Sequence, residues 1–347
     1  MLGPVAGWFV GRWTTDEFVA PDTDNGAGSL FYFPVSEVPT RAGTSAGAAM
    51  RRTLLTGDPA GCTEARTIWE QAESRENFGF EYGSLDYLCE YLIAAPVRRA
   101  EMVGSDDDGR RLVEFFEREG GWLLLADYID KRYGLTTPGA TRSPMKEDDF
   151  GFVQEFLCFG SPDRVGWEQP DEIMRLLRIG PGMAIADLGA GTGYMTYRFS
   201  DVVGATGKVY ALDVFARMVD AIQQVAESEG RSNIEAVHNS PTSLALATDS
   251  VDLVWICNVY HQFYGSTREA DRAAAMQSIH DVLRPGGRLV ILENTPEGEL
   301  PPGVLYHSGH AISSSLVIQQ LTAYGFQYKA RYSLIPQRYI LEFEAHQ

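Results

Sequence analysis

The sequence has few cysteines, a deficit of basic residues and no long apolar run. Its four cysteines, Cys62, Cys89, Cys158 and Cys257, lie far apart and form no C-x-x-C pair, which favours reduced thiols over a disulfide scaffold. Lys and Arg number 29 against 47 Asp and Glu, so the formal charge is −18. Residues 1–150 and 151–347 are each net acidic, and such surfaces repel phosphate backbones. We therefore expect no nucleic-acid partner and no anionic membrane partner.

No apolar stretch reaches the roughly 18 residues that a membrane span requires. The apolar start, MLGPVAGWFVGRW, lacks a positively charged leader and a convincing cleavage site. These features predict a cytoplasmic protein.

The chain is long enough for two domain-sized cores, with 347 residues of which 44% are hydrophobic. The stretch 136–149 concentrates Pro, Gly, Ser, Thr and charge between regions of better periodicity. We interpret it as a linker between an N-terminal domain (1–135) and a C-terminal domain (150–347). In the N-terminal domain only 63–77, 84–95 and 110–119 have helical patterns, and the opening 60 residues are rich in Gly, Thr and Pro. A largely helical accessory domain is predicted, and its function is not readable from the sequence.

Short apolar runs alternate with helical patterns in the C-terminal domain. The expected strands are 184–188, 208–214, 234–239, 251–258 and 288–294, with helical segments such as 217–228 and 267–283 between them. This alternation predicts an α/β fold with a parallel sheet and helices on both faces. Near the end, Ser313 can cap a helix that Gly325 stops, and two runs at 328–334 and 338–345 are close enough to be antiparallel neighbours.

The most informative segment is AIADLGAGTGY at 184–194, a short strand followed by a glycine-rich turn and a helix start. Glycines let the backbone approach a ligand closely, and a helix N-terminus offers free N–H groups to an anion. The dinucleotide fingerprint needs a small residue at 194 or 196, where this chain has Tyr and Thr, so the spacing excludes it. Asp187 at the strand end repels a pyrophosphate and suits a cationic ammonium or sulfonium.

The segment DLGAGTG at 187–193 resembles the first motif of the S-adenosylmethionine-dependent methyltransferases with a Rossmann-like fold. Further landmarks follow in the same order: the second strand ends in Asp213, a fourth strand spans 250–258, and LRPGGRLVILE at 283–293 looks like the turn and fifth strand. The resemblance covers about residues 160–347. It implies a seven-stranded, mostly parallel sheet with a C-terminal antiparallel hairpin, and S-adenosylmethionine as the cofactor.

The resemblance also implies a set of cofactor contacts. The loop and helix start would surround the methionine moiety, Asp213 would hold the ribose hydroxyls, and Phe215 and Met218 would pack near the adenine. Many members place an acidic residue after the third strand for the adenine amino group, whereas this chain has Asn239 and Ser240 there. The full expected set is Asp187, Gly189, Ala190, Gly191, Gly193, Tyr194, Asp213, Phe215, Met218, Asn239, Ser240 and Asn258.

Methyl transfer from a sulfonium requires alignment of nucleophile, methyl and sulfur, and a base where the acceptor carries a proton. The loop after the fourth strand, NVYHQF at 258–263, is the natural place for that base. His261 is the best candidate because imidazole accepts protons near neutrality, although it can also only pack beside the cofactor. Tyr260 and Tyr194 can face the sulfonium through their rings or pack in the core. Glu293 at the end of the fifth strand can contact the acceptor or act as a capping or solvated carboxylate.

Two other polar features have weaker functional interpretations. His307 and His310 are three residues apart, but no third ligand is evident, so we predict no metal site and consider a pocket-lining role more plausible. Asp252 lies near the start of the fourth strand, away from the ligand end of the sheet, where a structural hydrogen bond is expected.

We interpret the chain as a methyltransferase that transfers a methyl group to a small organic acceptor through O, N, C or S. Residues 1–135 would cover the acceptor site, form a homodimer interface, or both. Three alternatives stay open: a protein or RNA methyltransferase, a cofactor-binding protein without catalysis, and an enzyme that uses the cofactor for non-methylating chemistry.

Overall fold

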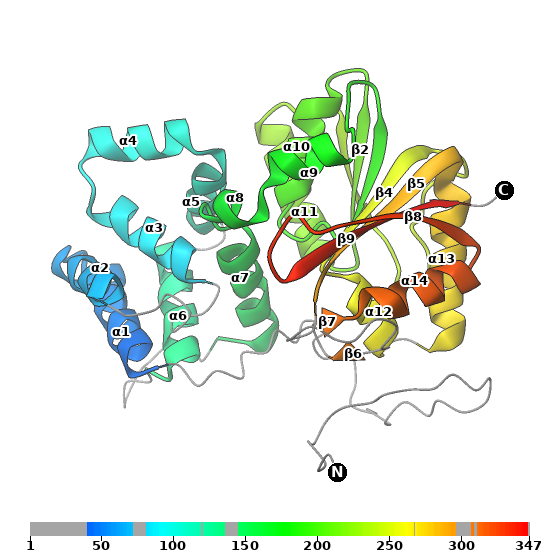
Figure 1. Cartoon of the computed structure of the whole chain (residues 1–347). Coiled ribbons are helices and arrows are strands. Elements are labelled where there is room, and N and C mark those ends of the chain that lie inside the picture. Colours follow the sequence, from blue (N-terminus) through cyan, green and yellow to red (C-terminus); the bar gives the residue numbers. More distant parts are fainter. Residues whose placement is uncertain are drawn as a thin grey trace, which may run out of the picture. The chain divides into compact units, whose positions relative to one another are not determined.

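The computed structural model describes residues 40–71, 81–118, 121–135, 145–266, 268–295, 307–308 and 311–345. The chain forms two compact units that divide between Glu168 and Gln169. This division falls after the predicted linker at 136–149, of which residues 136–144 lie outside the described residues. The first unit is helical and the second contains the sheet (Figure 1).

The described part of the first unit consists of helices, as predicted. They are α1 (Arg41–Thr56), α2 (Ala60–Gln71), α3 (Tyr82–Ile93), α4 (Pro96–Ser105), α5 (Asp107–Arg118), α6 (Trp122–Tyr133), α7 (Glu147–Phe159) and α8 (Arg164–Glu168). The sequence patterns indicated α2, α3 and α5. They did not indicate α1, α4 or α6.

Close helix packing explains why the glycines near α1 were misleading. A Cβ atom at Gly47 would lie 2.5 Å from the Tyr133 ring, and one at Gly61 would lie 2.2 Å from the Ala49 carbonyl oxygen. The glycines are therefore places where α6 and α2 approach α1, because only a residue without a side chain fits there. Thr40 begins α1 by accepting a hydrogen bond from the Gly43 N–H at 3.0 Å.

Aromatic packing attaches α7 to the helical unit. The Phe156 ring stacks on Phe115 of α5 with centroids 3.7 Å apart, and Phe152 meets the same ring edge-on. Both rings are buried. Burial of these large apolar surfaces explains why the division of the chain lies beyond α7 and not before it.

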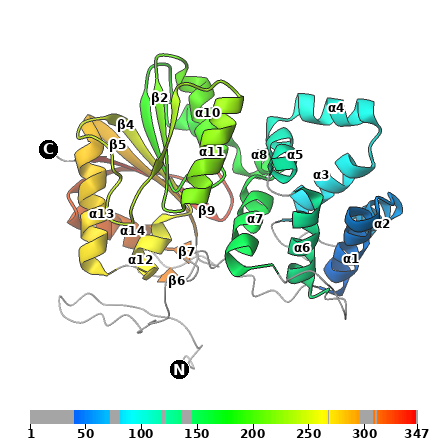
Figure 2. The same cartoon turned by 180° about the vertical axis from the view of Figure 1, so that it is seen from behind.

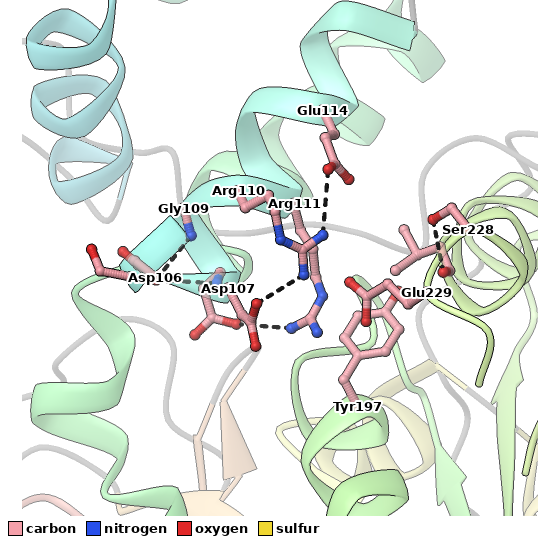
Figure 3. A network of polar contacts seen from close by, with 12 residues as sticks. Asp106, Asp107, Gly109, Arg110, Arg111, Glu114, Tyr197, Ser228 and Glu229 are labelled. Atoms are coloured by element: carbon pink, nitrogen blue, oxygen red, sulfur yellow. Dashed lines mark hydrogen bonds and ion pairs between the residues drawn. The ribbon is translucent and has the colours of Figure 1, made fainter. Parts of the chain in front are cut away.

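The acidic run at 106–108 begins helix α5. The Asp106 carboxylate accepts hydrogen bonds from the backbone N–H groups of Asp108 and Gly109, each at 3.1 Å, which caps α5 (Figure 3). Arg110, one turn on, pairs with Asp107 at 2.9 Å and with Glu114 at 3.3 Å. Negative charge in a first helical turn is favourable because it faces the positive end of the helix dipole.

The second unit is an α/β domain around a seven-stranded sheet. Its elements are α9 (Pro170–Leu176), β1 (Ala184–Leu188), α10 (Tyr194–Val203), β2 (Lys208–Asp213), α11 (Ala216–Ser228), β3 (Ile234–His238), β4 (Val251–Cys257), α12 (Tyr260–Ser266), α13 (Glu269–Val282), β5 (Leu283–Asn294), β6 (His307–Ser308), β7 (Ala311–Ile312), α14 (Ser314–Ala323), β8 (Phe326–Tyr332) and β9 (Arg338–Ala345). The strand order is β3-β2-β1-β4-β5-β9-β8, and β6 and β7 form a separate two-stranded sheet.

The predicted sheet is confirmed. β1 to β5 are parallel, and β9 runs antiparallel to both β5 and β8. Helices α9, α10 and α11 pack on one face, and α12, α13 and α14 pack on the other, so the central strands are buried on both sides (Figures 1 and 2). Ser313 caps α14 as predicted, accepting from the Leu316 N–H at 3.3 Å. Among the described helices, none combines the length and apolar character needed to cross a bilayer.

Candidate functional site

The glycine loop joins β1 to α10 in a backbone conformation that requires glycine. Gly189, Gly191 and Gly193 all have positive φ angles, 77°, 54° and 82°. A Cβ at Gly189 would lie 2.4 Å from the Val259 side chain, and one at Gly193 would lie 2.7 Å from the Tyr197 ring. The loop is fixed to the next strand, since the N–H groups of Gly189 and Ala190 both donate to the Leu212 carbonyl at 2.8 and 2.9 Å.

Asp213, at the end of β2, ties the glycine loop to the start of α11. Its two carboxylate oxygens accept backbone N–H groups, one from Gly191 at 2.9 Å and one from Phe215 at 3.0 Å. The side chain is buried. Burial raises the pKa of this carboxyl, and the backbone hydrogen bonds oppose that rise. The predicted ribose residue is therefore in place beside the loop, held by backbone contacts.

Asp187, at the end of β1, is also buried, and its Oδ2 accepts the Thr196 hydroxyl at 2.6 Å. Thr196 lies in the first turns of α10, so the pair connects the strand before the glycine loop with the helix after it. Thr196 was not singled out from the sequence. The sequence feature that could have identified it is a threonine at a position where the dinucleotide fingerprint requires glycine or alanine.

The predicted adenine residues lie at the ends of β2 and β3. Asn239 is buried, and its N–H donates to the Asp213 carbonyl at 3.1 Å. Its Oδ1 is buried without a hydrogen-bond partner in the described part of the chain. Ser240 is exposed, Phe215 is half-buried and Met218 is buried. The structure thus brings Asn239 to Asp213 and favours it over Ser240 as a polar contact.

Asn258 follows β4 in the left-handed region, with φ at 54°, which asparagine adopts more readily than most other non-glycine residues. Its N–H donates to the Leu292 carbonyl at 2.9 Å, which holds the end of β4 against β5. Its side-chain Oδ1 is the second buried amide oxygen at this edge for which the described residues supply no partner. A buried polar atom without a partner in the described residues is a feature often found at ligand sites.

His261 and Glu293 form a buried pair at the same edge of the sheet. The imidazole Nδ1 lies 2.9 Å from Glu293 Oε2, and the His261 backbone N–H donates to Oε1 at 3.1 Å. Glu293 is completely buried and His261 is 4% exposed. On the other side of the ring, Nε2 lies 3.0 Å from the amide nitrogen of Gln262. An amide nitrogen donates, so Nε2 is the acceptor and Nδ1 carries the proton that Glu293 accepts.

The structure therefore joins two residues that the sequence offered as separate candidates. Glu293 is not a solvated carboxylate, because it is completely buried and both of its oxygens contact His261. The hydrogen bond from the His261 backbone N–H makes it a capping residue for the start of α12. Gln262 was missed, and only its position next to His261 in the loop signalled it.

Tyr260 and Tyr194 are both buried. Tyr260 is fully buried among apolar side chains, and its hydroxyl donates to Gln320 Oε1 of α14 at 2.6 Å. Burial raises the pKa of this phenol well above its ordinary value. Tyr194 is 4% exposed, and the Arg198 guanidinium lies 3.8 Å from its ring centroid. A cation already covers that ring face, which argues against a second one there.

The remaining polar candidates lie outside this cluster. Asp252 accepts the Ala184 N–H at 2.7 Å and pairs with Arg284 at 2.8 Å, the structural role expected of it. The side chains of His307 and His310 lie outside the described residues. Within the described part of the chain, no three His, Cys, Asp or Glu side chains are grouped as metal ligands.

Comparison with known proteins shows which proteins the chain is similar to. Residues 151–302 match the model of the ubiE/COQ5 methyltransferase family. The ubiquinone/menaquinone biosynthesis C-methyltransferase UbiE of Shewanella frigidimarina (strain NCIMB 400) is 33% identical over 122 residues, which are 35% of this chain and 46% of that protein. The demethylmenaquinone methyltransferase of Lactococcus lactis subsp. lactis (strain IL1403) is 33% identical over 114 residues, 33% of this chain and 43% of that protein.

Among solved structures, a SAM-dependent methyltransferase from Aquifex aeolicus aligns with 53% of this chain and 93% of its own, at 21% identity and a TM-score of 0.45. The chain spans less than half the length of the two curated relatives above. The resemblance predicted from the glycine loop is confirmed: residues 151–302 are similar to S-adenosylmethionine-dependent methyltransferases of the ubiE/COQ5 family, and the sheet has the Rossmann-like strand order expected of them.

Proposed function

We propose that this protein binds S-adenosylmethionine at the carboxyl edge of its sheet and transfers the methyl group to a small organic acceptor. The observation that carries the proposal is the convergence of the glycine loop, Asp213 and the His261–Glu293 pair on strand ends at one edge of a parallel sheet. A cofactor site and a base thus lie on neighbouring strands of one rigid scaffold.

The residues present fit this cofactor. The loop glycines allow the positive φ angles that shape the loop, and the side chains of Val259 and Tyr197 occupy the space where a Cβ of Gly189 or Gly193 would lie. Asn239 and Asn258 supply amide oxygens that can accept from donors such as amino groups, and neither oxygen has a partner in the described part of the chain. Asp213 supplies the acceptor for ribose hydroxyls, beside the loop that its carboxylate fixes.

When bound, the cofactor supplies an electrophilic methyl group on a positively charged sulfur. The protein's own contribution is to remove the acceptor's proton. His261 accepts it at Nε2, once the Gln262 amide has turned away from that atom. Glu293 holds the Nδ1–H tautomer and stabilises the imidazolium that results, since a buried carboxylate 2.9 Å away is a strong charge-assisted partner.

The acceptor is a small molecule with a proton to lose. The names of the relatives, a C-methyltransferase of ubiquinone and menaquinone biosynthesis and a demethylmenaquinone methyltransferase, favour a small molecule over protein or RNA. The acidic surplus of the chain, −18, also opposes an RNA acceptor. We propose that the helical unit selects this acceptor. We also propose that it forms a homodimer interface. A cytoplasmic location stays a prediction.

The test is calorimetric titration of the full chain with S-adenosylmethionine and S-adenosylhomocysteine, followed by an acceptor screen that includes phenols and quinols. We expect saturable binding of both ligands and methylation of at least one small acceptor. A folded chain that binds neither ligand would refute the proposal. Binding without methylation of any acceptor would favour a cofactor-binding protein or non-methylating chemistry.

A further inference from the structure

Two cysteines that the sequence separates by 26 residues meet in the helical unit. The Cys89 thiol of α3 donates to the Cys62 sulfur of α2, with the two Sγ atoms 2.8 Å apart. Both side chains are completely buried, and neither is in a disulfide. Spacing alone gave no sign of this pair, because the contact comes from the packing of α2 against α3.

Ion pairs between α2 and α3 fix the two helices relative to each other beside Cys62 and Cys89. Arg66, one turn after Cys62, donates from Nε to Asp86 at 2.8 Å and from a terminal nitrogen to Glu90 at 3.2 Å. These carboxylates lie on α3 on either side of Cys89. Partly buried ion pairs that fix two helices against each other also fix which side chains meet between them.

The start of α2 is fixed as well. The Cys62 N–H donates to Thr53 Oγ1 at 2.7 Å, and the same hydroxyl donates to the Asp58 carbonyl at 2.7 Å. The preceding Gly61 has no room for a side chain against α1. Cys62 therefore cannot move away from Cys89 without disturbing the contact between α1 and α2.

The two thiols are chemically unequal. The hydrogen bond from Cys89 lowers the pKa of the Cys62 thiol against the effect of burial, and Thr53 and the Arg66 charge lower it further. Burial raises the pKa of the Cys89 thiol well above its ordinary value, and its hydrogen bond to Cys62 adds to this rise. Cys62 is thus the more acidic thiol of the pair.

We propose that Cys62 and Cys89 are a redox-active dithiol that a peroxide converts into a disulfide joining α2 to α3. The geometry is close to that of the product, since the sulfurs need to approach by only about 0.8 Å to reach bonding distance. This inference concerns the helical unit and is independent of the proposed methyl transfer.

The chemistry balances with hydrogen peroxide as the oxidant. The Cys62 thiolate attacks one peroxide oxygen, the O–O bond breaks, and a sulfenic acid and hydroxide form. The Cys89 sulfur then attacks the Cys62 sulfur and displaces the sulfenic oxygen, which leaves as water with the Cys89 proton. Two electrons pass from the two sulfurs to the peroxide, and two waters are produced for each disulfide. Because both sulfurs are buried, the first step proceeds through local opening of the α2–α3 contact.

The experiment treats the reduced full-length protein with hydrogen peroxide, alkylates the remaining thiols under denaturing conditions and maps the peptides by mass spectrometry. We expect one disulfide per chain, between Cys62 and Cys89, with Cys158 and Cys257 still alkylated. Dithiothreitol should restore four free thiols. Oxidation should raise the melting temperature of the wild-type protein by about 5 °C. Four free thiols after treatment, or a linkage that includes Cys158 or Cys257, would overturn the proposal.

Three variants test the order of the steps. In Cys89→Ser, Cys62 lacks its partner and should accumulate a sulfenic acid that dimedone traps. In Cys62→Ser, Cys89 should stay reduced. Cys158→Ser removes another buried thiol of the same unit and is the matched control, in which the disulfide should form as in the wild type. Equal dimedone labelling of the two partner variants would contradict the role of Cys62 as the first sulfur to react. The peptide map of the oxidised wild-type protein tests the disulfide without any variant, so it does not depend on whether the variants fold.

Discussion

Nδ1 of His261 lies 2.9 Å from Oε2 of Glu293, and the backbone N–H of the same histidine donates to the other oxygen of that carboxylate. One buried glutamate at the end of β5 therefore fixes both the start of α12 and the orientation of the ring. The carboxylate keeps the proton on Nδ1, which leaves Nε2 as the basic atom. We expect Glu293 to act through the histidine, as a positioning residue.

Glu293→Gln should lower kcat by about 10²-fold while cofactor affinity stays nearly unchanged. The glutamine amide can donate to Nδ1, which moves the ring proton to Nε2 and removes the base. The measurement is steady-state turnover on the first acceptor identified, together with calorimetric titration of S-adenosylhomocysteine.

His261→Ala and the double variant provide the control for this pair. Because the two residues act as a unit, the double variant should be about as slow as His261→Ala alone. Strictly additive losses would show that Glu293 does not act through His261. Losses confined to protein stability, with normal kcat for the folded fraction, would show that the pair is structural.

Asp213→Asn should weaken binding of S-adenosylmethionine by tenfold or more, roughly the loss of one charge-assisted hydrogen bond. The asparagine oxygen can keep the hydrogen bond from Gly191 that holds the glycine loop, while the amide nitrogen faces the Phe215 N–H and loses that contact. Unchanged affinity in titration calorimetry would remove Asp213 from the ribose role.

The same residue predicts a pH dependence. Burial raises the pKa of Asp213, so the folded chain holds this proton more tightly than the unfolded chain. Its contribution to the free energy of unfolding is thus present when the pH is below the ordinary Asp pKa of about 3.9. The contribution is lost as the pH rises through the higher pKa of the folded chain. Cofactor affinity should change in the opposite sense, strengthening over that window as the carboxylate ionises. Asp213→Asn should flatten both curves, and identical curves for the variant and the wild type would contradict the assignment.

Gly189→Ala should destabilise the sheet-containing unit and abolish tight cofactor binding. The new Cβ would lie 2.4 Å from the Val259 side chain, and the alanine would have to adopt a positive φ. Together these effects should lower the free energy of unfolding by about 2–4 kcal/mol. Gly230→Ala is the matched control, because its φ of 66° imposes similar strain while the space around it is open. The control should lose only about 1 kcal/mol in denaturant unfolding and bind the cofactor normally. Equal effects of the two variants would mean that the contact with Val259 is unimportant.

Local patterns were sufficient for the sheet. The run at 184–188 coincides with β1, and the short connection before Arg338 predicted the antiparallel hairpin, because alternation and turn residues are short-range signals. The interior of the helical unit was not predictable in this way. Gly47 looked like a loop residue but serves close helix packing, and Phe156 is held by a partner 41 positions earlier in the sequence.

The candidate site was likewise predicted only in part from the sequence. Residue types and order on the strands placed the glycine loop, Asp213 and Asn239 at one edge. The pairing of His261 with Glu293 depends on the register between β4 and β5, which no motif encodes. The meeting of Cys62 and Cys89 depends likewise on how α2 and α3 pack. Sequence patterns indicate which strand end carries a residue, whereas side-chain partners are set by tertiary packing.

Tyr260→Phe separates a packing role from the catalytic role that the loop sequence suggested. The wild-type hydroxyl donates to Gln320 at 2.6 Å in a fully buried setting, so its removal leaves a buried amide oxygen unpaired. We expect a loss of about 1–3 kcal/mol in the free energy of unfolding and an unchanged kcat for the folded enzyme. Tyr339→Phe is a matched control, because that hydroxyl is also buried and donates to the Ile312 carbonyl at 2.8 Å. A kcat that falls tenfold or more in Tyr260→Phe but not in Tyr339→Phe would favour a catalytic role for Tyr260, because both changes remove a buried hydroxyl hydrogen bond and Tyr260 lies in the loop that carries His261.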